Sequence, residues 1–214
     1  MIKKRELSFY NRVIKRAIDL FVALVGIIIL CIPMLIISVF IKCDSKGPVL
    51  FRQKRIGKNG KVFEILKFRS MCVGAEKTGS GVYSGKGDAR VTKVGKVLRA
   101  TSLDEIPQLF NIFIGDMSLI GPRPPLTYHP WPYSEYTDEQ KRMFNVRPGI
   151  TGWAQVHGRK DVEWHKRIDL NVWYVDNVSF VLDAKIFFMT IFKVLTNADN
   201  ENVGKTVSTE NTND

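Results

Sequence analysis

A long apolar segment extends from Ala17 to Ile41 and carries one ionisable residue, Asp19, near its start. As a straight helix it would measure about 37 Å at about 1.5 Å per residue, more than the roughly 30 Å hydrocarbon core of a bilayer. An apolar run of this length is more typical of a membrane segment than of a helix in a soluble core. No small-residue cleavage site follows it, which disfavours a signal peptide. The pattern therefore predicts a helix embedded in a membrane.

Two features indicate that this segment does not simply cross the bilayer. Pro33 lies in its middle, lacks a backbone N–H and pushes Ile32 away from helical geometry. Both flanks are basic, and basic flanks mark the cytoplasmic side of a membrane segment. We therefore expect a re-entrant helical hairpin broken at Pro33, with a kinked span and a buried core helix as the alternatives. The flanking cations are Lys3, Lys4, Arg5, Arg12, Lys15 and Arg16 on one side and Lys42, Lys46, Arg52, Lys54, Arg55 and Lys58 on the other.

The pattern after the membrane segment predicts a β-hairpin. Asn59-Gly60, a pair typical of tight hairpin turns, separates two short apolar runs between Val49 and Arg69. Because alternate side chains of a strand share a face, we expect Lys67 and Arg69 to lie together and to bind one anion. The side chains expected on this face are Phe63, Ile65, Lys67 and Arg69.

Helical periodicity recurs at three further places. Residues 1–16 predict a basic amphipathic helix on the membrane surface. Residues 99–114 predict a helix whose start fits a capping box of Ser102 and Glu105. Residues 183–195 predict an amphipathic helix, either in the core or at the interface. Between them, residues 73–88 are expected to form a loop, and residues 197–214 a disordered polar tail.

The net charge of +11 points to anionic partners, which include nucleic acid, anionic lipid and phosphorylated small molecules. Nucleic-acid binding is disfavoured, because the chain shows neither an aromatic platform nor a reading helix. The three cysteines and three histidines form no spacing typical of a zinc site. Phosphate-bearing small molecules and lipid therefore remain the expected partners.

Asp104 and Glu105 are the strongest candidates for chemistry. Adjacent helical residues point about 100° apart, so the two carboxylates are expected to have different roles. One carboxylate can attack phosphorus as a nucleophile, and the other can hold a divalent cation. A helix N-terminus would keep both ionised and would attract phosphate. The alternative is that the two acids only cap the helix.

Two turns rich in glycine and proline each hold an arginine in rigid surroundings. Arg123 lies in the turn 121–125, and Arg147 begins the turn 147–153. We expect both arginines to contact phosphate, although these turns also fit a purely architectural role.

Long motifs give the chain a resemblance to a known family. The motifs are KRAIDL, FRQKRIGKNGKVFEILKFRSM, LRATSLDEIPQLFNIFIGDMSLIGPRPPL, VRPGITGWAQVHGR and WYVDNVSF. From about Lys15 to about Leu195 the sequence resembles the bacterial sugar transferases, which are monotopic polyprenyl-phosphate phosphoglycosyl transferases similar to the bacillosamine-phosphate transferase of N-glycosylation. Because no appended sensor or multi-span domain accompanies these motifs, the sequence resembles the minimal form of the family.

The resemblance implies a two-step mechanism. The aspartate matching Asp104 attacks the β-phosphorus of a UDP-sugar, releases UMP and carries the phosphosugar until polyprenyl phosphate attacks it. The acid matching Glu105 is implied to bind Mg²⁺. Implied phosphate or nucleotide contacts are Lys67, Arg69, Arg99, Arg123 and Arg147. Phosphoryl transfer depends mainly on cations and positioning, which agrees with the residues found here.

Two positions depart from the family pattern. Ile32 stands before Pro33 where the family often has serine, which leaves the geometry of the break less constrained. Asn171 stands where the family commonly has an aspartate, although Asp169 lies two residues earlier.

The expected fold class is α+β, mostly α, with a small α/β catalytic body. The expected parts are a surface helix at 1–16, a re-entrant membrane helix at 17–41, a cytosolic catalytic domain at 42–196 and the tail at 197–214. The expected location is the cytoplasmic face of a bacterial inner membrane, with downstream glycosyltransferases as further partners. A membrane-anchored scaffold that binds anionic lipid or nucleic acid is the non-enzymatic alternative. A metal-dependent glycosyltransferase would normally need a larger nucleotide-binding fold.

Overall fold

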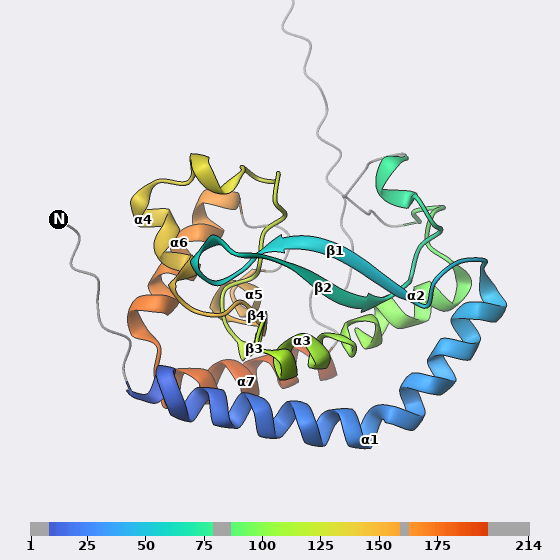
Figure 1. The fold of residues 1–214 in the computed structure, drawn as a ribbon, viewed down its shortest axis with the longest axis horizontal. Coiled ribbons are helices and arrows are strands. Elements are labelled where there is room, and N and C mark those ends of the chain that lie inside the picture. Colours follow the sequence, from blue (N-terminus) through green and yellow to red (C-terminus); the bar gives the residue numbers. More distant parts are fainter. Residues whose placement is uncertain (1–8, 79–86, 159–162, 197–214) are drawn as a thin grey trace, which may run out of the picture.

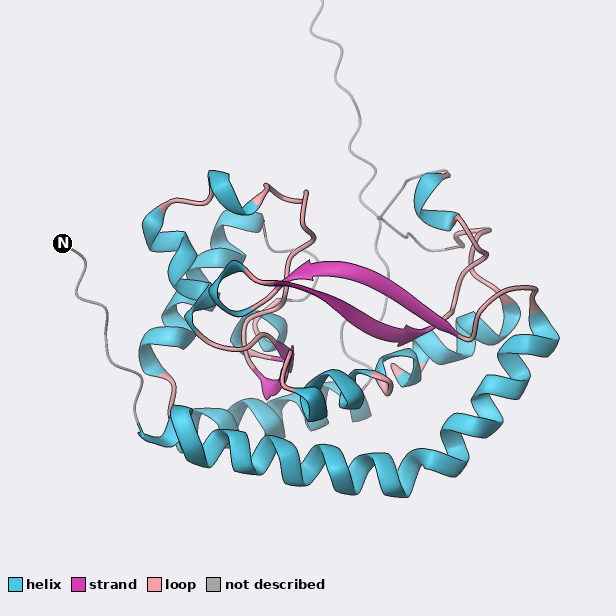
Figure 2. Ribbon diagram, viewed as in Figure 1, coloured by secondary structure: helices cyan, strands magenta, loops and turns pink. Residues whose placement is uncertain are grey.

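The computed structural model describes residues 9–78, 87–158 and 163–196, which lie mostly in helices around two small sheets (Figure 2). The expected α+β, mostly α fold is therefore confirmed. The predictions for residues 1–8 and for the tail lie outside the described residues. The elements are α1 (Lys15–Asp44), β1 (Leu50–Ile56), β2 (Val62–Phe68), α2 (Lys93–Ala100), α3 (Gln108–Ile114), β3 (Ser118–Ile120), α4 (Asp138–Lys141), β4 (Gly149–Thr151), α5 (Trp153–Val156), α6 (Trp164–Asn177) and α7 (Phe180–Leu195).

The apolar segment forms one long helix along the base of the molecule. A π-helical turn at Tyr10–Ile14 leads directly into α1, which continues through Pro33 to Asp44. The helix curves upward towards β1 at its C-terminal end (Figure 1). The expected hairpin of two helices is thus replaced by one bent helix. A proline removes one backbone donor and bends a helix, but neighbouring turns can continue the helix beyond it.

The surface of α1 remains largely uncovered by the rest of the protein. The helix is long and apolar enough to cross a membrane, and only 6% of its most apolar window is buried. α3, which packs against α1, and α7, whose first turn binds Lys15, also expose large apolar side chains (Figure 1). So many exposed apolar side chains disfavour a soluble core helix. We call this surface the apolar base; it includes Phe21, Leu24, Ile28, Ile32, Leu35, Phe113, Ile114, Phe187, Phe188 and Phe192.

A buried ion pair fastens the start of α1 to α7. The Lys15 ammonium donates to the Asp183 carboxylate at 2.5 Å, and both side chains are less than a tenth exposed. The hydroxyls of Tyr10 and Tyr174 donate to the same carboxylate at 2.7 and 2.6 Å. Three donors thus stabilise one buried anion, which compensates for its removal from water.

Two further charged residues of α1 bind backbone groups of the body. The Arg16 guanidinium donates to the carbonyls of Ile112 and Phe113 at the C-terminal end of α3. The buried Asp19 carboxylate accepts the backbone N–H of Leu119 in β3 at 3.0 Å. The charged residues of the KRAIDL motif therefore fix the position of α1 against α7, α3 and β3.

The predicted β-hairpin is confirmed. β1 and β2 pair antiparallel, and the connecting turn places Asn59 and Gly60 at positive φ. On the free edge of β2, the buried Asn111 side chain of α3 accepts the Leu66 N–H and donates to the Glu64 carbonyl. This clamp holds α3 against the hairpin. Beneath it, α1, β2 and α3 share a core of Ala23, Phe63, Ile65, Ile112 and Met117.

Asp183→Ala is expected to lower the free energy of unfolding by about 3 kcal/mol, because it leaves the Lys15 ammonium buried without its counter-charge. The measurement is denaturant unfolding in detergent micelles. The control is Asp169→Ala, which removes an exposed aspartate from α6 and should change stability by less than about 0.5 kcal/mol. Equal stabilities of the two variants would show that the ion pair does not hold α1 in place.

Candidate active site

Two parallel strands bring the two glycine- and proline-rich turns together. β3 pairs with β4 through Ser118 opposite Gly149 and Ile120 opposite Thr151. A Cβ at Gly149 would lie 2.1 Å from the backbone nitrogen of Gly121, and a Cβ at Gly152 would lie 2.0 Å from the Gly121 carbonyl oxygen. No larger residue fits these positions, so the glycines permit the contact between the turns.

The turn that contains Arg123 also meets the outer edge of β1. The Ile56 N–H donates to the Pro125 carbonyl at 3.0 Å, and Arg55 forms an antiparallel bridge with Leu126. The Arg55 guanidinium donates to the Pro124 carbonyl at 3.1 Å. These contacts bring Arg123 and Arg55 to one place, although they are far apart in the sequence.

A shallow cleft opens between the hairpin, the start of α3 and the two turns. Three cations and one carboxylate line it, so its wall carries a net positive charge. Register explains part of this set, because Arg55 and Lys67 lie on the same face of the hairpin. The lining residues are Arg55, Ile65, Lys67, Glu105, Gln108, Arg123, Pro124, Gly149 and Ile150.

One of the two candidate acids, Glu105, lines this cleft, and Asp104 precedes it in the chain. The Lys67 ammonium binds Glu105 Oε1 at 2.6 Å, and both side chains are partly exposed. Asp104 is not among the lining residues, but it lies close enough for Lys67, Glu105 and Arg99 to affect its titration. The pKa of Asp104 is raised above its ordinary value, chiefly because burial disfavours the carboxylate, while Lys67 and Arg99 oppose the increase.

The local backbone around the acids differs from the sequence prediction. Ser102 adopts a left-handed conformation with φ of 58° and makes no side-chain cap, so the predicted capping box is wrong. Asp104 and Glu105 lie in a short 3₁₀ turn, Leu103–Glu105, and α3 begins only at Gln108 after Pro107. The expected helix N-terminus therefore does not lower the pKa of Asp104, and burial has the opposite effect.

Arg99 lies near the acids, as expected. It occupies the last turn of α2, which precedes the 3₁₀ turn, and its charge favours the ionised form of Asp104. Lys67 and Arg99 thus lie near Asp104, whereas Arg123 lines the cleft together with Glu105.

Arg69 does not lie in the cleft. Its buried guanidinium donates to the carbonyls of Lys46 and Ser45 and to the Ser45 hydroxyl, just beyond the end of α1. β2 ends at Phe68, so the alternation that relates Lys67 to Arg69 ends there as well. The prediction that Lys67 and Arg69 bind one anion together is therefore wrong, and Arg69 stabilises the C-terminal end of α1.

Arg147 is also turned towards the scaffold. Its Nε donates to the Gly115 carbonyl at 2.8 Å, beyond the end of α3, and the residue is not among those that line the cleft. Together with Arg16, it places positive charge at the C-terminal end of α3. The architectural interpretation of the turn 147–153 fits this geometry.

Sequence reasoning missed two residues of the cleft, Arg55 and Gln108. Arg55 was placed among the basic residues that flank the membrane segment. The Asn59-Gly60 turn contained the necessary signal, because the register it sets places Arg55 opposite Phe63 and on the same face as Lys67. Gln108 carried no comparable signal, since its exposure to the cleft depends on where α3 begins.

The expected Mg²⁺ would find one carboxylate, that of Glu105, among the residues that line the cleft. Among the described residues, no three His, Cys, Asp or Glu side chains gather as a metal-binding group. Mg²⁺ commonly binds through one or two carboxylates together with substrate phosphates, so a large protein cage is not required. Glu105 supplies a carboxylate at the cleft wall.

The apolar base and the cation-lined cleft together define a membrane-associated protein suited to anionic ligands. Residues 10–197 match the model of the bacterial sugar transferase family. The chain therefore belongs to this family and is a sugar transferase enzyme.

Similar proteins extend this comparison. The chain is 42% identical over 184 residues to an uncharacterized sugar transferase of Bacillus subtilis, EpsL, which covers 86% of this chain and 88% of that protein. It is 42% identical over 192 residues to a UDP-glucose:undecaprenyl-phosphate glucose-1-phosphate transferase of Klebsiella pneumoniae, covering 87% of this chain and 41% of the relative. It is 44% identical over 186 residues to a UDP-N-acetylgalactosamine-undecaprenyl-phosphate N-acetylgalactosaminephosphotransferase of Aeromonas hydrophila, covering 86% and 44%. The chain thus spans less than half the length of these last two relatives.

Asp104→Asn is expected to raise the melting temperature at pH 7, because it removes a carboxylate that burial disfavours. The pKa of Asp104 in the folded state lies above its ordinary value of 3.8, so stability falls as the pH rises through the interval between the two values. The difference between the variant and the original protein should therefore shrink as the pH is lowered towards 3.8.

The measurement is thermal unfolding in detergent micelles across this pH range. Asp169→Asn, at an exposed position, serves as the control and should show no such trend. A lower melting temperature for Asp104→Asn at pH 7 would contradict the expected electrostatic cost.

Proposed function

We propose that the chain transfers a sugar-1-phosphate from a UDP-sugar to polyprenyl phosphate and releases UMP. The observation that carries the proposal is the partly buried Asp104 carboxylate beside a cleft whose wall has a surplus of cations. The printed names of the Klebsiella and Aeromonas relatives support it, because both describe transfer of a sugar phosphate to undecaprenyl phosphate. The reaction would be the first membrane step in the assembly of a surface polysaccharide or a glycoprotein glycan. Downstream glycosyltransferases would extend its product.

In the first step, a carboxylate oxygen of Asp104 attacks the β-phosphorus of the donor. The bond from this phosphorus to the bridging oxygen breaks, and the bridging oxygen leaves on UMP with the electron pair. In the second step, a phosphate oxygen of the polyprenyl phosphate attacks the same phosphorus. The bond to Asp104 breaks, which regenerates the carboxylate and yields polyprenyl diphosphate sugar. The carboxylate thus divides one difficult transfer into two displacements.

The cations around the acids would stabilise the charge of both displacements. Lys67 and Arg123 line the cleft, and Arg99 acts on Asp104 from α2. Fixed cations are the main requirement of phosphoryl transfer. Glu105 would hold Mg²⁺, which when bound neutralises phosphate charge. Arg69 and Arg147, which bind backbone carbonyls, are not needed for this role.

The apolar base would rest in the cytoplasmic leaflet of the bacterial inner membrane, with α1 re-entrant and both of its ends on the cytoplasmic face. The curvature of α1 supports this topology, because its C-terminal end turns back towards the body (Figure 1). The polar bonds of Lys15, Arg16 and Asp19 support it as well, since they hold the start of α1 against the same body. A lipid-borne phosphate would then reach Asp104 from the membrane side.

The UMP product provides the test of the reaction. Incubation with Mg²⁺, polyprenyl phosphate and a panel of UDP-sugars is expected to release UMP with at least one donor. Asp104→Asn should lower the rate by at least about a thousandfold, since an amide cannot serve as the nucleophile. Chromatography of the nucleotide product measures both.

Asp169→Asn serves as the matched control and should retain the rate. Release of UDP instead of UMP would indicate transfer of the sugar alone and would exclude this reaction class. Full turnover by Asp104→Asn would remove the nucleophile assignment, and normal Mg²⁺ dependence in Glu105→Gln would remove the metal role.

Membrane topology is tested by labelling. With the exposed Cys31 and Cys72 replaced by serine, the exposed native Cys43 and a cysteine introduced at Met1 report the two sides of the apolar segment. A membrane-impermeant maleimide should label both in inverted inner-membrane vesicles and neither in intact spheroplasts. Labelling of the two positions from opposite sides would establish a kinked span and leave the transferase assignment intact.

A further inference from the structure

The cleft contains a guanidinium that forms no direct ion pair with the described residues. Lys67 is paired with Glu105, whereas Arg55 donates only to neutral acceptors, the Pro124 carbonyl at 3.1 Å and Gln53 Oε1 at 2.5 Å. The Nε atom of Arg55 is buried and has no hydrogen-bond partner among the described residues. A buried donor without a protein acceptor is open to a ligand group or a water molecule.

The electrostatics of Arg55 indicate that this ligand is an anion. Burial and the neighbouring Arg123 lower the pKa of Arg55 to about 10, so it remains charged at neutral pH. Two adjacent guanidiniums disfavour each other in the absence of a shared counter-charge. A diphosphate supplies that charge in the planar, bidentate geometry that guanidinium prefers.

The orientation of Arg55 is set by a pair of side chains behind it. The Gln53 amide accepts from Arg55 through its oxygen and donates to the Glu76 carboxylate through its nitrogen. Gln53 and Arg55 share one face of β1, which makes this contact possible. Because both ends of the amide are engaged, the Arg55 side chain is held towards the cleft.

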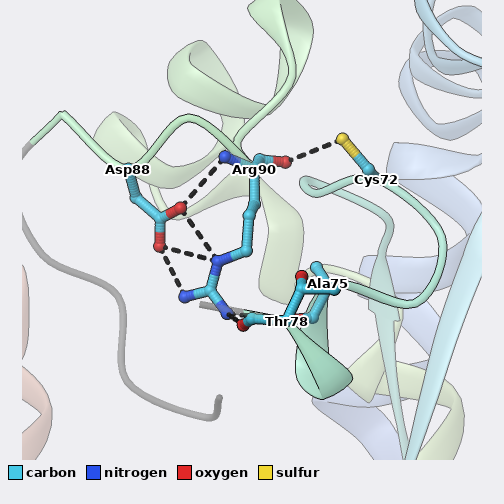
Figure 3. Close-up of polar contacts among 5 residues, drawn as sticks. All are labelled: Cys72, Ala75, Thr78, Asp88 and Arg90. Atoms are coloured by element: carbon cyan, nitrogen blue, oxygen red, sulfur yellow. Dashed lines mark hydrogen bonds and ion pairs between the residues drawn. The ribbon is translucent and has the colours of Figure 1, made fainter. Parts of the chain in front are cut away.

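A second set of contacts supports Glu76 in turn. Glu76 lies in the 3₁₀ turn Ala75–Lys77, and the Arg90 guanidinium donates to the carbonyls of Ala75 and Thr78 at 2.7 and 2.6 Å. Arg90 is held by two-point contact with the Asp88 carboxylate, and the Cys72 thiol donates to the Arg90 carbonyl (Figure 3). This arrangement fixes the turn from which Glu76 reaches Gln53.

The position of Arg55 favours the soluble donor over the lipid acceptor. α3, which packs against α1, binds the free edge of β2, whereas Arg55 lies on β1 at the opposite edge of the hairpin. In Figure 1, β1 lies farther from α1 than β2 does. Arg55 therefore lies at the edge of the hairpin that is farther from the apolar base, which favours a ligand from solution.

We propose that Arg55 binds the diphosphate of the nucleotide donor, and that Gln53 and Glu76 are positioning residues that orient it. This inference rests on the proposed function and assigns a donor-binding residue that the sequence did not reveal. Arg55 holds the donor, together with Arg123, while Asp104 performs the displacement.

The test uses UDP as the probe, because UDP carries the diphosphate and needs no knowledge of the sugar. UDP with Mg²⁺ is expected to raise the melting temperature of the original protein in nanodiscs. Arg55→Ala should weaken UDP binding about ten- to a hundredfold, the effect of losing hydrogen bonds to a charged group. Arg55→Lys should recover only part of the loss, because an ammonium cannot bind in two-point fashion.

The control is Arg52→Ala, which removes a charge from the exposed face of the same strand and should leave UDP binding unchanged. Steady-state kinetics then distinguish binding of the UDP-sugar from binding of polyprenyl phosphate, since both ligands carry phosphate. Arg55→Ala and Gln53→Met should raise KM for the UDP-sugar at least fivefold and leave KM for polyprenyl phosphate unchanged. Glu76→Ala should behave similarly, and Glu76→Gln, which still offers an acceptor to Gln53, should restore the donor KM.

Unchanged UDP binding in a folded Arg55→Ala protein would overturn the proposal, and so would a change confined to KM for the lipid. The proposed function fails separately, if the original protein binds UDP through Arg55 but releases UMP from no UDP-sugar. Gln53→Met and Glu76→Ala could both fold less well and still show the normal KM for the UDP-sugar in the folded fraction. That result would show that these residues are only structural.

Discussion

The attachment of α1 to the body is the interaction on which the rest of the structure depends. Lys15, Arg16 and Asp19 are polar groups at the start of an otherwise apolar helix, and each is paired with a group of the body. Polar groups near an apolar environment are costly unless they are paired, so these three bonds permit few alternative placements. They fix α3 relative to α1, and α3 follows directly from the turn that carries Asp104. The distance from the apolar base to the site is therefore set by charged residues of the membrane helix.

The second constraint is the close contact between the two glycine-rich turns. Gly121, Gly149 and Gly152 permit backbone distances that any Cβ would prevent. This contact directs the turn containing Arg123 along the edge of β1, where Arg55 lies. Residues distant in sequence thus meet through backbone packing, and the cleft needs no long loop to assemble its cations. The same geometry turns Arg147 towards Gly115, so two similar turns serve different purposes.

Local sequence patterns predicted much of the fold, but they did not predict the long-range contacts. The Asn59-Gly60 turn, the apolar helix and the helix ending at Leu195 were predicted because each depends on short-range chemistry. The predicted position of the Arg69 side chain was wrong, because the alternation of side chains along a strand does not continue beyond Phe68, where β2 ends. The helix expected around Asp104 was also placed wrongly. A left-handed Ser102 and the delayed start of α3 reflect packing against the hairpin rather than local propensity. The acid pair itself was found from sequence, while Arg55 required the register of the hairpin.

Two electrostatic imbalances remain in the folded protein, and one ligand would relieve both. Burial makes the Asp104 carboxylate unfavourable, and in the neighbouring cleft Arg55 lies beside the like charge of Arg123 without a direct ion pair among the described residues. Simple neutralisation between them does not occur, because Asp104 does not line the cleft that holds the two arginines. In the proposed reaction, a diphosphate supplies the missing negative charge to the cations, and bonding to phosphorus removes the charge of the buried carboxylate. The site is thus more favourable with its substrate, and the covalent step offsets the cost of burying its nucleophile.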